Sequence, residues 1–127
     1  MNVPAELRYS SDHEWARAES STRVRVGITD YAQDALGDVV YVDLPAVGDR
    51  IEIGASFGEV ESTKSVSELY APVTGTVVEI NGDLVDEPQK LNEDPYGEGW
   101  ICVVAPDDAT QFEALLDAVA YSELIGA

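Results

Sequence analysis

Cysteine, histidine and cationic side chains are scarce in this 127-residue sequence. It has one cysteine, one histidine and two lysines, Lys64 and Lys90. A single cysteine cannot form an internal disulfide, and a zinc site would need more ligands than His13 and Cys102 provide. A serine or cysteine nucleophile would have to pair with His13, and no nucleophile-elbow sequence is present. We therefore expect no metal site and no catalytic residues, and interpret the chain as a carrier or binding module.

Negative charge dominates the composition. The sequence holds 25 Asp and Glu residues against 7 Lys and Arg, for a net charge of -18. This charge repels nucleic acids and anionic membranes, so we expect neither as a partner and expect cationic partner surfaces instead. The acidity is equally compatible with an adaptation for solubility or high salt.

Long apolar runs are also lacking. No stretch approaches the roughly 18 apolar residues that span a bilayer. Residues 1–9 show neither an apolar targeting segment nor an amphipathic Arg/Ser-rich pattern. We therefore expect a cytoplasmic location for the chain as given.

Short runs of alternating hydrophobicity predict a mainly β fold of the α+β class, in one domain over residues 1–127. A chain of this length buries about two-thirds of the surface that its unfolded form exposes. Residues 38–44 contain a continuous apolar run, Val39-Val40-Tyr41-Val42, for which we expect a central strand. The other predicted strands cover residues 13–18, 23–28, 50–53, 56–61, 66–70, 74–80 and 100–104.

Capping signals predict helices at two places. Asp30 and Gln33 resemble a capping box and Gly37 suits a helix C-terminus, which predicts a helix over residues 30–36. Near the C-terminus, Asp107 or Asp108 begins a helix, Asp117 restarts it with a kink, and Gly126 ends it. Its expected apolar stripe is Phe112, Leu115, Leu116 and Val119. Residues 83–99 read mostly as loop, with a helical turn near residues 88–91.

The most informative segment is the predicted hairpin around Lys64. Its tip reads Glu61-Ser62-Thr63-Lys64-Ser65. A lysine at such a tip is often only a solvated turn residue. A carrier, however, needs a reactive side chain held away from the fold, and the small neighbours of Lys64 leave room around its amine. A cofactor tethered there gains a high effective concentration at each docked enzyme.

The sequence of residues 58–75 is Gly-Glu-Val-Glu-Ser-Thr-Lys-Ser-Val-Ser-Glu-Leu-Tyr-Ala-Pro-Val-Thr-Gly. This segment resembles the lipoylation segment of the glycine cleavage system H-protein family. Further blocks resemble that family in the same order, at residues 13–15, 26–32, 36–40, 44–45 and 92–100. Thr63 stands where the family commonly has valine, and Ala16 where a larger apolar residue is usual. The resemblance implies a barrel-sandwich hybrid fold with lipoic acid in amide linkage on Lys64.

The same resemblance implies a function and a set of partners. The lipoyl arm accepts an aminomethyl group from glycine decarboxylase and presents it to the aminomethyltransferase. Dihydrolipoyl dehydrogenase then reoxidises the arm. A lipoate ligase or lipoyl transferase attaches the cofactor. The carrier itself is non-catalytic, and we expect it to be a monomer.

In this family the loaded arm rests in a surface cleft. Because an aminomethyl amine is cationic, we hypothesise that Glu14 receives it, with Asp12 and Glu68 as weaker candidates. The alternative for each is an ordinary exposed acid. His13 and Trp15 are expected to pack the cleft wall.

Other interpretations remain. A biotin carrier shares the lysine hairpin, although methionines typically flank its lysine. The lipoyl domain of a 2-oxo acid dehydrogenase complex is closer in chemistry but lacks the blocks at residues 13–15 and 92–100. An unmodified acidic interaction domain and a secondary role as a lipoyl donor stay open.

Overall fold

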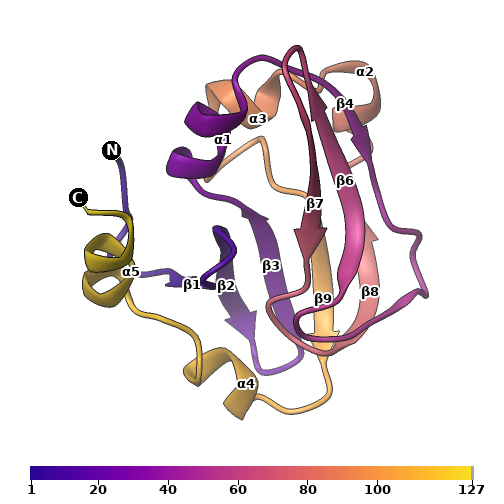
Figure 1. Ribbon diagram of the computed structural model, residues 1–127. Helices are drawn as coiled ribbons and strands as arrows, with labels where there is room; N and C mark the ends of the chain where they lie inside the picture. The colour runs from indigo at the N-terminus through magenta and orange to yellow at the C-terminus, as the bar shows by residue number, and fades with distance from the viewer. Residues whose placement is uncertain (127) are drawn as a thin grey trace.

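Two antiparallel β-sheets lie against each other and make up most of the molecule (Figure 1). The computed structural model describes residues 1–126. The larger sheet has the strand order β1-β2-β3-β9-β8-β5, and the smaller has the order β4-β6-β7. The mainly β, α+β fold predicted from the sequence is confirmed.

The strands are β1 (Arg8–Tyr9), β2 (Glu14–Ser20), β3 (Arg23–Ile28), β4 (Val39–Asp43), β5 (Arg50–Ile51), β6 (Ser56–Ser62), β7 (Val66–Tyr70), β8 (Gly75–Ile80) and β9 (Cys102–Pro106). The helices are α1 (Asp30–Leu36), α2 (Asp83–Asp86), α3 (Lys90–Glu93), α4 (Thr110–Glu113) and α5 (Ala118–Ile125). The predicted strands at residues 23–28, 56–61 and 66–70 match β3, β6 and β7 to within one residue.

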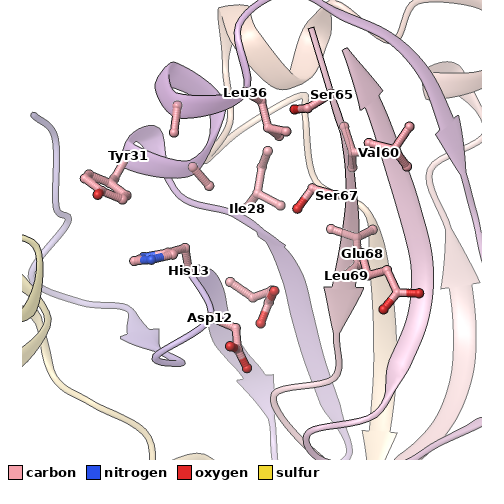
Figure 2. A pocket seen from close by; sticks show the side chains of 14 residues that line it. Asp12, His13, Ile28, Tyr31, Leu36, Val60, Ser65, Ser67, Glu68 and Leu69 are labelled. Atoms are coloured by element: carbon pink, nitrogen blue, oxygen red, sulfur yellow. The ribbon is translucent and has the colours of Figure 1, made fainter.

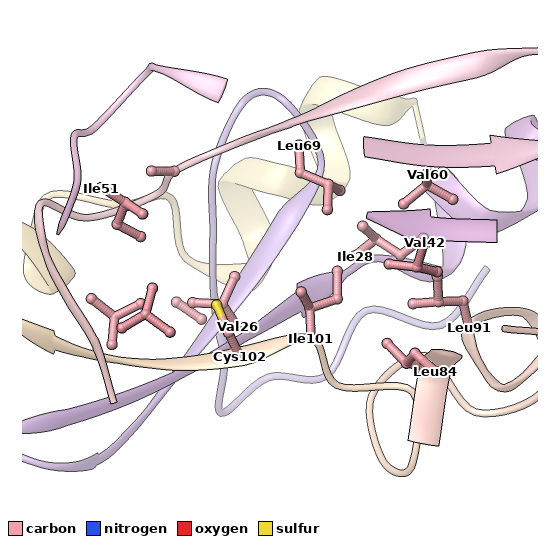
Figure 3. Packing of buried hydrophobic residues seen from close by; sticks show 14 of the residues in the cluster. Val26, Ile28, Val42, Ile51, Val60, Leu69, Leu84, Leu91, Ile101 and Cys102 are labelled. Atoms are coloured by element: carbon pink, nitrogen blue, oxygen red, sulfur yellow. The ribbon is translucent and has the colours of Figure 1, made fainter. Parts of the chain in front are cut away.

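The hydrophobic core fills the space between the two sheets (Figure 3). Side-chain burial alternates along the first part of β3 as its sequence predicts, with Val24 and Val26 buried on one face. Val60 and Leu69 of the smaller sheet belong to the same cluster, as does Cys102. Burying such aliphatic side chains contributes about 1.5–3 kcal/mol each, which holds the β6–β7 hairpin firmly on the larger sheet.

Strand β4 is an edge strand, so the prediction of a central strand there was wrong. The pairing with β6 shifts register between Val39 and Tyr41, which indicates a β-bulge. Val40 and Tyr41 are 49% and 54% exposed, whereas Val42 is buried. A continuous apolar run usually marks a strand covered on both faces, but the bulge turns two of these side chains to solvent.

Helix α1 has the predicted bounds, but its N-terminal cap differs. Thr29 Oγ1 accepts a hydrogen bond from the Ala32 amide at 3.2 Å, so Thr29 is the cap. Gln33 instead donates to the Asp30 carboxylate, side chain to side chain. Gly37 follows the helix with a φ of 79°, and its amide donates to the Gln33 carbonyl.

The C-terminal segment breaks into two helices where the sequence predicts a kink. Asp117 Oδ1 accepts from the Ala120 amide at 2.8 Å and caps α5, and Gly126 ends it in the left-handed conformation. The expected apolar stripe does not continue through the break, because Val119 is 69% exposed. Tyr121 is the side chain that α5 buries, stacked on Tyr9.

The segment predicted to be mostly loop contains the one-turn helices α2 and α3. Leu84 and Leu91 are fully buried in the core and anchor these two turns. The Lys90 ammonium group lies 3.6 Å from Asp83 and 3.7 Å from Glu87. Asn81 joins the two ends of the segment, because its side-chain amide donates to the carbonyls of Glu98 and Trp100. The segment is therefore a fixed cover over the core.

The buried thiol of Cys102 gives a direct test of this packing. Burial raises its pKa to about 12. We expect no reaction with a soluble thiol reagent at pH 8 in native buffer and one reactive thiol per chain in guanidinium chloride, because the thiolate is the reactive form. Rapid stoichiometric labelling of the native protein would contradict the packing of β9.

Candidate functional site

Lys64 lies at the turn that joins β6 to β7, and its side chain is exposed. Ser62 fixes the shape of this turn. Its hydroxyl accepts from the amides of Lys64 and Ser65 at 3.3 and 3.1 Å, and its own amide donates to the Ser65 carbonyl at 2.8 Å. A serine at this position closes the turn on itself, so the lysine projects from a defined backbone.

The loop between α1 and β4 supports the hairpin from one side. The Thr63 amide donates to the carbonyl of Asp38 at 3.0 Å. The stem of Lys64 lies across Gly37, since a Cβ atom at Gly37 would stand 3.1 Å from Lys64 Cε. The φ of 79° and ψ of -158° at Gly37 belong to a region that glycine alone adopts readily. Glycine is thus needed there for the backbone and for room beside the lysine.

A cleft of about 310 Å³ opens beside the hairpin, between α1 and β7 (Figure 2). Apolar side chains form its walls, and carboxyl groups lie at one end. The lining residues are Asp12, His13, Glu14, Ile28, Tyr31, Ala32, Ala35, Leu36, Val60, Ser65, Val66, Ser67, Glu68 and Leu69. This combination suits an aliphatic chain that ends in a polar or cationic group.

Glu14 is the buried acid of the cleft, only 2% exposed. The Ser10 hydroxyl donates to its Oε1 at 2.7 Å, and the Tyr70 amide donates to its Oε2 at 3.3 Å. Burial raises the pKa of Glu14 to about 8, against the opposing effect of these two hydrogen bonds. Near neutral pH the carboxyl group is therefore largely protonated, and a cation in the cleft would favour its ionised form.

Of the two residues expected in the cleft wall, His13 lines the cleft and Trp15 does not. His13 borders the cleft, but its ring points away, toward α5, where Nδ1 lies 2.8 Å from the Tyr121 hydroxyl (Figure 2). Burial lowers the pKa of His13. Trp15 does not line the cleft, so its expected place in the wall was wrong. It is fully buried in a second cluster, where its indole donates to the Pro95 carbonyl.

The cleft brings together three of the carboxyl groups singled out in the sequence. Glu14 lies inside, whereas Asp12 and Glu68 are exposed residues of the lining. The Glu68 carboxylate also accepts from the Tyr70 hydroxyl. Glu61 is not part of the cleft; it is exposed on β6, paired with Tyr41 on one neighbouring strand. Of the tip residues 61–65, Ser65 alone lines the cleft.

Sequence reasoning missed four contributors to this site: Ser10, Gly37, Tyr70 and Asn92. Ser10 precedes Glu14 by four positions, and its hydroxyl donates to the Glu14 carboxyl group. The contacts of Tyr70 and Asn92 join segments more than 50 residues apart, so no local pattern announces them.

Comparison with known proteins agrees with this geometry. A family model described as Glycine cleavage H-protein matches residues 7–127. The chain belongs to the glycine cleavage H-protein family. Members of this family are the lipoyl-lysine carriers of the glycine cleavage system, and the family assignment made from the sequence is confirmed.

Relatives and a solved structure match over almost the whole chain. A glycine cleavage system H protein of Anaeromyxobacter sp. (strain K) is 56% identical over 125 residues, which cover 98% of this chain and 97% of the relative. One of Mycobacterium avium (strain 104) is 57% identical over 124 residues, or 94% of each chain. The crystal structure of such a protein from Mycobacterium marinum superposes with a TM-score of 0.90 at 45% identity, covering 98% of this chain and 100% of that one.

The raised pKa of Glu14 predicts how stability depends on pH. Between about pH 5 and pH 8 the folded protein retains a proton that the unfolded chain has released, so this group's contribution to stability falls as pH rises. The slope reaches up to about 1.4 kcal/mol per pH unit. Because Glu14→Gln removes this titration, its stability relative to the wild type should increase from pH 5.5 to pH 7.5 in urea unfolding.

An exposed acid serves as the control. Glu123→Gln should keep the same pH slope as the wild type, because Glu123 is exposed on α5. If Glu14→Gln also kept the wild-type slope, Glu14 would not titrate in this range, and the account of a largely protonated acid in the cleft would be wrong.

Proposed function

We propose that this chain is the lipoyl-bearing shuttle of the glycine cleavage system, with the lipoyl group in amide linkage on Lys64. It carries the aminomethyl group from glycine decarboxylase to the aminomethyltransferase, and dihydrolipoyl dehydrogenase reoxidises it. It acts as a monomer of one domain, residues 1–127. The observation that supports this best is the position of Lys64, at a rigid hairpin tip beside a cleft with a buried acid.

The surroundings of the two lysines favour Lys64 as the attachment point. The Lys90 side chain is 17% exposed, with its ammonium group within 4.0 Å of the carboxylates of Asp83, Glu87 and Glu98. Lys64 is exposed and forms no ion pair with any residue of 1–126. A modifying enzyme must reach and deprotonate the amine, and an ammonium group held by three carboxylates resists both.

The hairpin and cleft fit a lipoyl group. That group supplies a reversible disulfide on a flexible aliphatic chain. Ser62, Thr63 and Ser65 are small enough to leave its attachment open, and the stem of Lys64 already lies along the neighbouring loop at Gly37. Ile28, Leu36 and Val60 present apolar surface to an arm that folds back into the cleft.

Glu14 supplies the electrostatic part of the site. Its carboxyl group is buried but available to the cleft, where an incoming ammonium group favours its ionised form. A charge-assisted hydrogen bond to a cation is worth about 1.5–3 kcal/mol. Asp12 and Glu68 lie at the exposed edge of the lining, where solvent weakens any such attraction. Glu14 therefore holds the cargo amine, with Asp12 and Glu68 as minor contributors.

The compartment is the bacterial cytoplasm. The relatives named above are bacterial. No helix in residues 1–126 is long and apolar enough to span a membrane. The buried, unpaired Cys102 is compatible with a reducing compartment.

Lys64→Arg tests the attachment site. Incubated with a lipoate ligase, ATP and lipoic acid, the wild type should gain one lipoyl group by intact mass, and Lys64→Arg should gain none. Lys90→Arg is the matched control and should be modified like the wild type. Modification of Lys64→Arg, or a biotin increment on protein from the native host, would contradict the proposal.

Glu14→Gln tests retention of the cargo. In lipoylated protein charged with the aminomethyl group, this variant should lose the group about tenfold faster, because a neutral amide binds an ammonium group less strongly by more than about 1 kcal/mol. Mass spectrometry over time measures the loss. Glu123→Gln should behave as the wild type, whereas an unchanged rate in Glu14→Gln would remove Glu14 from this role.

A further inference from the structure

Asn92 of α3 fastens the loop on which the Lys64 hairpin rests. Its side-chain Oδ1 accepts from the Val39 amide at 2.9 Å. Its Nδ2 donates to the Gly37 carbonyl at 2.8 Å and to Gln33 Oε1 at 3.1 Å. The carboxamide thus uses its acceptor and one donor on the segment between α1 and β4, and its other donor on the last turns of α1. Residues 37–39 are called the shelf below.

The shelf is also the part of the fold that touches the hairpin tip. Its middle residue, Asp38, accepts the hydrogen bond of the Thr63 amide at 3.0 Å. Its first residue, Gly37, lies under the stem of Lys64. The hydrogen-bond partner therefore alternates along the shelf. The Gly37 carbonyl and the Val39 amide bind Asn92, whereas the Asp38 carbonyl between them binds the Thr63 amide of the hairpin.

The shelf needs this external support because its own sequence does not define its shape. Gly37 has the largest conformational freedom of any residue, and the structure holds it at a positive φ. Asn92 itself is well anchored, since its neighbour Leu91 is fully buried in the core. The half-buried carboxamide therefore holds the shelf in a fixed position relative to the core. Through Asp38, the shelf in turn holds the hairpin tip.

We propose that Asn92 is a positioning residue for Lys64, and that its three hydrogen bonds keep the hairpin tip in the geometry that the lipoate-attaching enzyme recognises. This inference rests on the proposed function of Lys64. The hydrogen bonds of Asn92 go to Gln33, Gly37 and Val39, so it acts on Lys64 through the shelf. Loss of the Asn92 side chain lowers the fraction of molecules whose hairpin has the geometry that the enzyme recognises. The apparent KM for modification therefore rises, whereas kcat stays nearly unchanged.

Asn92→Asp is the sharpest variant. It keeps the shape and the oxygen that accepts from Val39, but it places a second carboxylate oxygen against the Gly37 carbonyl and Gln33 Oε1, where an NH₂ group donates in the wild type. Asn81→Asp is the matched control, because Asn81 uses the same donor group to bind the Glu98 and Trp100 carbonyls, away from the shelf. Both variants should lower the melting temperature.

The two readouts are hydrogen exchange and modification kinetics. In Asn92→Asp we expect the Thr63 amide to exchange about tenfold faster, whereas the Ser62 amide, bonded within the turn to Ser65, should be unchanged. With a lipoate ligase, KM for the carrier should rise about tenfold and kcat should stay within about twofold. Asn81→Asp should match the wild type in both. If Asn92→Asp is unfolded at 25 °C, Asn92→Ser replaces it, since it adds no charge to the shelf.

The outcomes separate this inference from the proposed function. Failure of the wild type to be modified would contradict the proposed function, and the exchange of the Thr63 amide would still test Asn92. A modified wild type together with unchanged KM and unchanged Thr63 exchange in Asn92→Asp would overturn the positioning role. Equal effects of Asn81→Asp and Asn92→Asp would also overturn it, because they would show a general loss of stability.

Discussion

The hydrogen bond from the Thr63 amide to the Asp38 carbonyl joins the lysine hairpin to the rest of the site. Without it, the hairpin would be anchored only through its two strands, and its tip could bend away from α1. With it, the turn, the shelf and the end of α1 form one unit beside the cleft. The direction in which Lys64 leaves the surface depends on this unit, as does the position of its stem over Gly37.

The site separates an exposed amine from a buried acid. Lys64 stands in solvent, where a modifying enzyme and successive partners can reach it. Glu14 lies inside the cleft with its two oxygens held by Ser10 and Tyr70. A buried carboxyl group is tolerated when it is hydrogen-bonded or neutral, and Glu14 is both, so it can ionise when a cation enters the cleft. An exposed amine for attachment and a buried acid beside it are what a carrier protein needs, because a carrier is itself a substrate for other enzymes.

How far the sequence predicts this structure depends on how local each signal is. The bounds of α1 and of the β6–β7 hairpin follow from neighbouring residues, and both predictions are confirmed. The edge position of β4 does not follow, because it depends on a bulge against β6 and on what covers each face. The prediction that Trp15 lines the cleft was wrong because its position also depends on a distant contact: its hydrogen-bond partner Pro95 lies 80 residues away.

In the functional site, too, features marked by local sequence were predictable and features that depend on distant contacts were not. The family blocks point to Lys64 and Glu14, and the structure places Glu14 inside the cleft and Lys64 on the hairpin beside it. The support of the hairpin was not predictable. The side chain of Asn92 binds residues 53 to 59 positions earlier in the chain, and an asparagine in a segment predicted to be mostly loop is typical of an ordinary turn.

The most direct test of the whole account is glycine turnover in a reconstituted system. Purified glycine decarboxylase, aminomethyltransferase and dihydrolipoyl dehydrogenase from a bacterial relative would be combined with this protein after treatment with a lipoate ligase. The carrier role of Lys64 predicts glycine-dependent turnover with the wild type and none with Lys64→Arg, at equal concentrations of folded protein. Turnover with Lys64→Arg, or none with a wild type shown to be lipoylated, would contradict it.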